Sequence, residues 1–236
     1  MGNRKSFGVM IDDIHTFQEY GLIMTDKKIS TPVAKLKMVD VPGRNGSVDM
    51  SEVATGDVRY NDRTIELKFV SQEKVGNWEA LLSEMRNQFC GRKCRYVFDD
   101  DIAFYWSGRC TDISMEAKEA ILYVNMKITV DPYKYTIQST AEDWLWDPFD
   151  FEQGVINETG NLVVNGTLSV EIIGLKKYVN PIIVSNANMS VVFNGKTYDV
   201  KAGSQVMYGI VLTEGTDTLQ FKGNGTVSIN YVGGSL

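Results

Sequence analysis

The sequence predicts a mainly β protein, built as a β-rich N-terminal domain with one inserted α-helix and a C-terminal β-sandwich. Three observations lead to this prediction. An alternation of apolar and polar residues with period two runs through 62–70, which is typical of a half-buried strand. One stretch, 71–91, has helical periodicity. From Asn161 onward, short apolar runs recur about every ten residues between turn residues, as in a β-sandwich.

The N-terminal part contains about seven strand-like segments. In the clearest of them, Ile65, Leu67 and Phe69 face one way, while Glu66 and Lys68 face the other. The other predicted strands are 7–11, 22–24, 33–41, 94–98, 104–109 and 120–130. A lone histidine, His15, lies beside aromatic residues and is predicted to be a packing residue.

The single predicted helix carries one apolar stripe at spacings of three and four residues. Its members are Val75, Trp78, Leu82, Met85 and Phe89. Either Ser71 or Asn77 can cap the N-terminus, and Gly91 can end the helix. We therefore expect the stripe to pack against the sheet.

Residues 43–60 are predicted to form an exposed arm that contacts a partner. Asn45-Gly46 is the signal of a two-residue hairpin turn, and the following residues 51–61 lack strong periodicity. An isolated two-stranded hairpin is marginal in water, so such a segment needs another surface to lie against.

We expect residues 1–140 to form the N-terminal domain, 141–160 a linker and 161–236 the C-terminal domain. Asn165-Gly166, Asn194-Gly195 and Asn224-Gly225 read as turns, and the middle pair as a hairpin. The predicted strands here are 167–173, 181–185, 189–193, 196–201, 206–212, 218–222 and 226–232.

Charge and composition exclude several function classes. The chain of 236 residues has 24 basic and 30 acidic residues, a net charge of −6, and this argues against nucleic-acid recognition. No apolar run is long enough to span a bilayer, and no signal peptide is recognised, so we expect synthesis in a cytoplasm without membrane insertion. Cys90, Cys94 and Cys110 form no CxxC pair and are expected to be reduced thiols.

No motif points to catalysis, a cofactor or a metal. The chain lacks a GxSxG elbow, a phosphate-binding loop and an HExxH helix, so no catalytic, cofactor-binding or metal-binding residue is predicted. Asp99-Asp100-Asp101 lacks the alternating ligand pattern of a calcium loop and is better explained as a solvated turn. Paired carboxylates from separate strands keep a glycoside hydrolase open as a weaker alternative.

The order of several short motifs resembles the siphophage distal tail protein family over nearly the whole chain. The N-terminal motifs are Pro42-Gly43-Arg44-Asn45-Gly46, Tyr60-Asn61-Asp62-Arg63-Thr64-Ile65, Phe98-Asp99-Asp100-Asp101, Tyr105-Trp106-Ser107-Gly108-Arg109 and Asp131-Pro132-Tyr133-Lys134-Tyr135. The C-terminal motifs are Pro181-Ile182-Ile183-Val184, Phe193-Asn194-Gly195, Leu219-Gln220-Phe221 and Ile229-Asn230-Tyr231; this part resembles the galectin-like or carbohydrate-binding-module-like sandwich of that family.

The resemblance implies a non-enzymatic hub at the tip of a long non-contractile phage tail, in the virion. It implies a homo-hexameric ring that joins the tail tube protein to a tail-associated lysin or tail-fibre protein, with a tape-measure or receptor-binding protein as further partner. The subunits would be joined by a hairpin belt. The predicted inter-subunit contacts are Arg44, Asn45, Val48, Met50, Val53, Val58 and Tyr60.

An alternative function is binding of host-wall carbohydrate. Trp144 and Trp146 lie in an aromatic-rich segment at the domain junction, and such rings either pack one domain against the next or stack on sugars. With Tyr208 they form the predicted set of sugar- or partner-contact residues. The source, whether a phage, a prophage or a tail-derived particle, stays open at this point.

Overall fold

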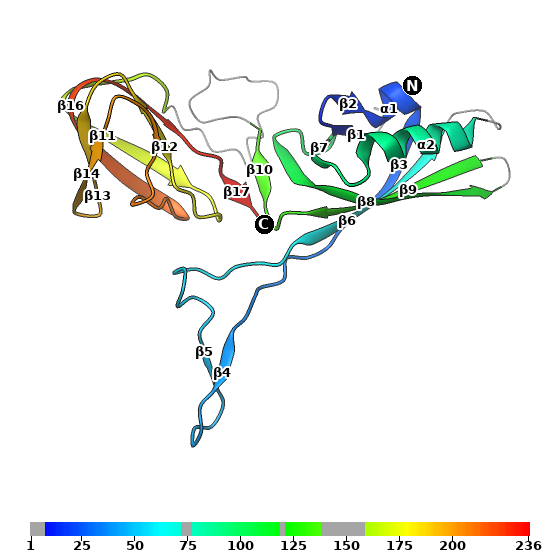
Figure 1. Cartoon of the computed structure of the whole chain (residues 1–236), viewed down its shortest axis with the longest axis horizontal. Coiled ribbons are helices and arrows are strands. Elements are labelled where there is room, and N and C mark those ends of the chain that lie inside the picture. Colours follow the sequence, from blue (N-terminus) through cyan, green and yellow to red (C-terminus); the bar gives the residue numbers. More distant parts are fainter. Residues whose placement is uncertain (1–7, 72–76, 119–120, 138–158) are drawn as a thin grey trace. The chain divides into compact units, whose positions relative to one another are not determined.

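The computed structural model describes residues 8–71, 77–118, 121–137 and 159–236. Contacts between α-carbons divide the chain into two units. Unit 1 comprises Met1–Asp101 and Trp106–Pro132, and unit 2 comprises Ile102–Tyr105 and Tyr133–Leu236. Most of the predicted linker, 141–160, lies outside the described residues. Each unit is β-rich, and the predicted mainly β class is confirmed (Figure 1).

Unit 1 is built on one antiparallel sheet. The strand order is β2 (Ile14–His15), β1 (Val9–Ile11), β7 (Lys93–Phe98), β8 (Phe104–Lys118), β9 (Ile121–Val130), β6 (Arg63–Ser71) and β3 (Leu22–Ile29). The chain also forms two described helices, α1 (Thr16–Tyr20) and α2 (Trp78–Phe89). Strand β6 thus lies inside the sheet, paired with β3 on one side and β9 on the other, as its clear alternation suggests.

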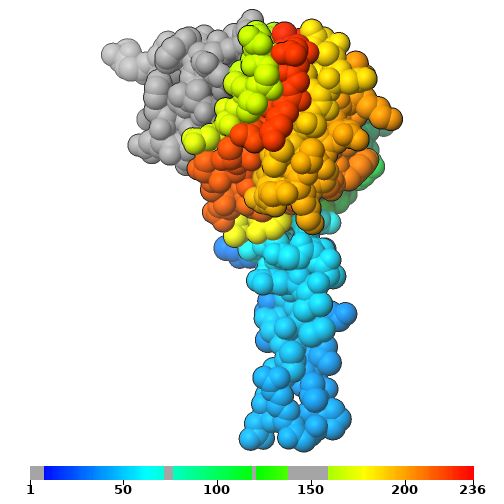
Figure 2. Space-filling view, turned by 90° about the vertical axis from the view of Figure 1, so that its left-hand side faces the viewer, coloured from blue at the N-terminus to red at the C-terminus, as the bar shows by residue number. Residues whose placement is uncertain are grey.

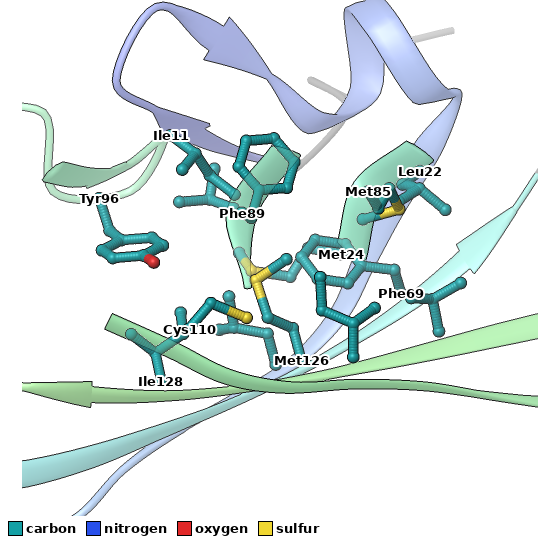
Figure 3. Close-up of a cluster of buried hydrophobic side chains, with 14 of the residues drawn as sticks. Ile11, Leu22, Met24, Phe69, Met85, Phe89, Tyr96, Cys110, Met126 and Ile128 are labelled. Carbon is teal, nitrogen blue, oxygen red and sulfur yellow. The ribbon is translucent and has the colours of Figure 1, made fainter. Parts of the chain in front are cut away.

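The core of unit 1 lies between α2 and one face of the sheet. Met85 and Phe89 of α2 lie in one cluster with strand residues that include Phe69 and Met126 (Figure 3), and Leu82 of α2 belongs to the same cluster. Every one of these side chains is at most 2% exposed. Burial of one such side chain contributes about 1.5–3 kcal/mol, and no residue of the segment 31–62 belongs to this cluster.

The helices differ in detail from the prediction. Of the two candidate N-caps for the predicted 71–91 helix, Ser71 ends β6 and Asn77 directly precedes α2. Helix α1 was not predicted, because five residues are too few to show a periodic stripe. It ends at Gly21, whose φ of 60° is the left-handed conformation that glycine adopts freely.

Unit 2 is organised around one long strand, β16 (Gly215–Asn230), which pairs with β11 (Leu162–Gly174) along the whole of β11. One half of β16, around Phe221, also pairs with β13 (Met189–Phe193), to which β14 (Lys196–Val200) is added. The other half, around Ile229, pairs with β12 (Ile182–Ser185), to which β15 (Gly203–Val206) is added. The two halves contribute to one common core.

Unit 2 also contains two short strands. Strand β10 (Lys134–Thr136) pairs with β17 (Gly234–Ser235) and with Phe104 and Tyr105 at the beginning of β8.

The Asn-Gly turn predictions are only partly correct. Asn194 and Gly195, with φ of 48° and 75°, connect β13 and β14 as the predicted hairpin. The other two pairs are not turns, because Asn165 lies opposite Asn224 inside the β11–β16 ladder. The predicted strands 218–222 and 226–232 are accordingly parts of one strand, β16. The predicted strand 206–212 is wrong, because Val206 ends β15 and the chain then turns, with the Ile210 amide donating to the Met207 carbonyl at 3.0 Å.

Candidate functional site

The segment between β3 and β6, residues 31–62, forms a two-stranded arm, and we call it the arm. Its central part pairs β4 (Met38–Asp40) with β5 (Ser47–Asp49) in antiparallel register (Figure 1). Nearer to the sheet, the Lys35 amide donates to the carbonyl of Arg59 at 2.7 Å and the Asn61 amide to that of Val33 at 2.9 Å. Figure 2 shows the arm as a narrow column of blue and cyan atoms.

Ser51 joins the two strands of the arm where β4 begins and β5 ends. Its hydroxyl accepts a hydrogen bond from the Lys37 amide at 2.8 Å and donates to the Asp49 carboxylate at 2.5 Å. The backbone adds a bond from the Met50 amide to the Lys37 carbonyl at 2.8 Å. The bonds from Ser51 lower the pKa of the Asp49 carboxyl, although this carboxyl is exposed to solvent.

The tip of the arm differs from the predicted two-residue turn. Asp40 pairs with Ser47, so six residues, 41–46, connect the strands. Left-handed φ values occur at Gly43, 81°, and Gly46, 75°, whereas Asn45 keeps a negative φ. The tip is therefore a longer loop in which two glycines, rather than an Asn-Gly pair, supply the reversals.

The arm exposes apolar side chains on both strands. The exposed fraction is 57% for Val33, 62% for Leu36, 57% for Met38 and 69% for Val53. Within this fully described segment, only Asp57 is buried. A two-stranded ribbon of this kind has no core of its own, and its outer backbone edges carry donors and acceptors that a further strand can pair with.

The base of the arm is fixed by Arg63 and Ser30. The Arg63 Nε donates to the Ser30 carbonyl at 2.7 Å, and the Ser30 hydroxyl accepts from the Thr64 amide at 2.8 Å. The guanidinium lies over the ring of Trp106, 4.7 Å from its centroid, and Arg63 is only 8% exposed. Burial lowers the pKa of Arg63 from its usual value, although the group stays cationic.

The predicted contact residues all lie on the arm, at different depths. Arg44 and Asn45 are exposed at the tip, and Val53 is exposed between β5 and the base. Val48, Met50, Val58 and Tyr60 are half-buried by neighbouring residues. Whether a partner contacts these residues stays a prediction.

Sequence reasoning did not single out the opposite strand of the arm. Its exposed apolar residues are Val33, Leu36, Met38, Val39 and Val41. The alternation in 33–41 predicted a strand. The turn residues that follow it directly indicate that this strand is the first half of a hairpin, and therefore part of the arm. The arm consequently begins about twelve residues before the predicted limit at 43.

The predicted sugar-contact residues are only partly covered by the structure. Trp144 and Trp146 lie outside the described residues. Tyr208, in unit 2, is 81% exposed, and the Asn180 side-chain amide donates to the carbonyls of Tyr208 and Ile210 at 3.4 and 2.7 Å. An exposed aromatic ring on a turn held by hydrogen bonds can stack on a sugar, but a single ring offers little contact area.

Asp99 and Asp100 of the acidic cluster at 99–101 make polar contacts with residues elsewhere in the chain. The Asp99 carboxylate accepts from the Gly8 amide at 2.7 Å and lies 3.1 Å from Nε2 of His15. Asp100 pairs with Lys27 at 2.6 Å. Among the residues that the structure describes, no group of three or more His, Cys, Asp or Glu is placed to hold a metal ion, and no helix is long and apolar enough to cross a bilayer.

Comparison with known proteins finds a similar fold among the solved structures. No family model matches the chain, and no curated protein matches it significantly. Among solved structures, the chain is similar to the crystal structure of the Dit (gp 19.1) protein of phage SPP1. The TM-score is 0.63 at 13% sequence identity, and the alignment covers 98% of this chain and 100% of that chain. That structure is described as a paradigm of the hub adsorption apparatus in phages that infect Gram-positive bacteria.

Proposed function

We propose that this chain is a structural hub protein at the distal end of a long non-contractile phage tail, and that it acts as a homo-hexameric ring. The observation that carries the proposal is the similarity of nearly the whole chain to the SPP1 Dit protein, a component of a hub adsorption apparatus. The motif order in the sequence led to the same distal tail protein family. A fold alone supports many functions, so the proposal also rests on a structural feature that suits a hub.

The arm is that feature. It places exposed apolar residues and open strand edges on a ribbon that has no core of its own. A neighbouring subunit can satisfy both, because it can pair with the strand edge and cover residues such as Leu36 and Val53. A contact of this kind is head-to-tail, and six such contacts close into a ring. A permanent ring would bury upwards of roughly 2,000 Å² at each interface.

The proposed partners follow from the position of a hub. On one side the ring would receive the tail tube protein, and on the other the tail-associated lysin or the tail-fibre protein. A tape-measure protein or a receptor-binding protein is a further proposed partner. The site of action would be the tail tip of the virion, after synthesis in the host cytoplasm.

A pair of matched valines tests the proposal. Val53, on the arm, is 69% exposed, and Val163, on β11 in unit 2, is 70% exposed. Since both are so exposed, Val53→Asp and Val163→Asp should each change the stability of the monomer by no more than about 0.5 kcal/mol. Only Val53→Asp places a charge in the proposed interface, where burying an unpaired carboxylate costs several kcal/mol.

The measurement is the mass of the full chain in solution by analytical ultracentrifugation, with negative-stain images of the particles. We expect six-membered rings for the unmodified chain and for Val163→Asp, and smaller species for Val53→Asp. A chain that stays monomeric at high concentration, with or without its tail partners, would contradict the ring.

A second candidate function, carbohydrate binding, has one observation in its favour, the exposed ring of Tyr208 on unit 2. Titration of the full chain with host-wall polysaccharide in a calorimeter tests it. Binding that is lost in Tyr208→Ala would support this function, and no heat of binding by the unmodified chain would remove it.

A further inference from the structure

Two of the three cysteines lie next to each other at the end of α2. Cys90 is the residue that directly follows the helix, and Cys110 lies in β8. The two residues form a parallel β-bridge, and the Gly91 amide donates to the Cys110 carbonyl at 2.9 Å. Their Sγ atoms are 4.0 Å apart, and both thiols are free. Figure 3 shows the Cys110 side chain within the buried cluster of unit 1.

The backbone geometry suits a covalent link between them. Bridged strands lie about 4.8 Å apart, which falls within the Cα separation of roughly 4.4–6.8 Å that a disulfide spans. To bond, the two sulfur atoms must approach by about 2 Å, and rotation about the Cα–Cβ bonds supplies such a movement without displacement of the strands. The bridge thus holds the pair close to the required geometry.

The two thiols differ in access. Cys110 is 1% exposed and its thiol lies 3.6 Å from the Asp112 carbonyl, to which it donates. Burial, with the neighbouring Cys90 as a second cause, raises the pKa of Cys110 to about 12. Cys90 is half-buried and is therefore the thiol that a reagent from solution meets first. An oxidant would act on Cys90, and Cys110 would then resolve the intermediate.

The third cysteine has a different environment. Cys94 lies opposite Gly108 in the β7–β8 ladder and is 3% exposed. Burial and a hydrogen bond with the Asp12 carboxylate raise the pKa of its thiol to about 11. The described sulfur–sulfur contact joins Cys90 and Cys110, and does not include Cys94.

We propose that Cys90 and Cys110 are a site of disulfide formation, which links the end of α2 to β8 when the protein meets an oxidising environment that contains small disulfides such as glutathione disulfide. The Cys90 thiolate attacks one sulfur of glutathione disulfide and releases one glutathione thiolate, which takes up the proton that Cys90 lost. Cys110 then loses its proton, attacks Sγ of Cys90 and releases the second glutathione. Two protein thiols are oxidised, and one disulfide of the oxidant is reduced to two thiols.

The link would stabilise the covering helix against the sheet. It closes a loop of about twenty residues, between positions 90 and 110, and so reduces the entropy of the unfolded chain. For a chain of this size, a loop of that length raises the melting temperature by roughly 6–12 °C. The proposal stands independently of the proposed function, because it involves residues of unit 1 only.

Peptide mapping of the full chain tests the proposal. The reduced protein is incubated with glutathione disulfide, alkylated with iodoacetamide after unfolding in guanidinium, and digested for mass spectrometry. We expect a peptide pair cross-linked through Cys90 and Cys110, alkylated Cys94, and a higher melting temperature that returns to its former value on reduction.

Two variants complete the test. Cys94→Ala should keep the cross-link and the rise in melting temperature, whereas Cys90→Ser should lose both. Because the mapping of the unmodified chain decides by itself, failure of a variant to fold does not weaken the test. Alkylation of all three cysteines, a cross-link through Cys94, or glutathione retained on Cys90 would each overturn the proposal.

Discussion

The guanidinium of Arg63 lies 4.7 Å from the ring centroid of Trp106, at the point where the arm joins the sheet. Arg63 pairs with Val130 of β9 in the ladder, and its Nε donates to the carbonyl of Ser30 on the other strand of the arm base. One side chain therefore joins both strands of the base to the sheet. The contacts of Arg63 lie where β3 ends and β6 begins, and they mark the base of the arm.

Replacement of Arg63 should destabilise unit 1 and loosen the base of the arm. Arg63→Ala removes a charge-assisted hydrogen bond and a cation–π contact, which together contribute about 2–4 kcal/mol at a desolvated site. Urea denaturation followed by tryptophan fluorescence measures the loss. Arg63→Lys keeps the charge but not the planar fork, and should recover less than half of the difference. An unchanged urea midpoint in Arg63→Ala would show that the anchor contributes nothing.

Ser51 should control the local order of the arm rather than the global stability. Ser51→Ala removes the acceptor of the Lys37 amide, and loss of one hydrogen bond, about 1 kcal/mol, raises the opening constant roughly fivefold. Hydrogen exchange of the Lys37 amide, followed by NMR, measures this increase. Ser204→Ala, at an exposed serine of β15, serves as the control and should leave the exchange of Lys37 unchanged. Equal exchange in all three proteins would contradict the role of Ser51.

Gly108 should tolerate no side chain. A Cβ at this position would lie 2.3 Å from the Thr129 carbonyl oxygen and 2.6 Å from Cγ1 of Val130, so β8 and β9 would have to separate. We expect Gly108→Ala to lower the free energy of unfolding by about 2–4 kcal/mol. Gly43→Ala is the matched comparison, because Gly43 has open space around it and only its φ of 81° opposes a side chain. Its cost should be about 1 kcal/mol and confined to the arm. Similar urea midpoints for the two variants would contradict the steric argument.

The stability of unit 1 should fall in alkaline solution. Burial raises the pKa of the Cys94 thiol to about 11 and that of Cys110 to about 12, whereas unfolded thiols titrate near about 8.5. Above pH ~8.5 the unfolded chain loses these protons and the folded chain keeps them. The stabilisation is therefore complete below that pH and is lost as the pH rises towards 11–12.

Urea midpoints between about pH 8 and pH 11, measured with a phosphine reductant, check this dependence. Each thiol contributes a slope of about 1.4 kcal/mol per pH unit. Cys94→Ala should remove the contribution of one of the two thiols and flatten the profile. A midpoint that stays constant up to about pH 10.5 would contradict the buried, protonated state of the thiols.

The sequence predicted best those elements whose pattern reports burial on one face. Strand β6 and the stripe of α2 were predicted because one face of each is buried against the other, and the periodicity of the apolar residues records that burial. Strands β8 and β16 were predicted too short. Each contains a residue that usually interrupts a strand, Asp112 in β8 and Gly223 in β16. Pairing of β8 with β9, and of β16 with β11, allows the strands to continue.

For the candidate site, the sequence revealed one strand of the arm and missed the role of the other. Residues 33–41 alternate as a half-buried strand does, yet Leu36 and Met38 lie exposed. The surface that we propose to cover them, that of a neighbouring subunit, is not part of the single chain. Composition contains no information on that surface. The contact between Cys90 and Cys110 was equally beyond the sequence, since it depends on where α2 ends relative to β8.

The pairing of β16 with both halves of unit 2 has a consequence for cooperativity. If β13 and β14 detach in a fluctuation, the segment around Phe221 stays paired with β11. The segment around Ile229 lies beyond the β11 ladder, which ends at Val227, and when β12 and β15 detach it keeps the hydrogen bond from the Ile229 amide to the Thr159 carbonyl at 2.8 Å. Neither partial opening frees the whole of the central strand, so we expect its amides to exchange with solvent more slowly than those of β14 and β15. The slowest-exchanging amide protons of unit 2 should accordingly lie on the part of β16 that pairs with both β11 and β13, around Phe221.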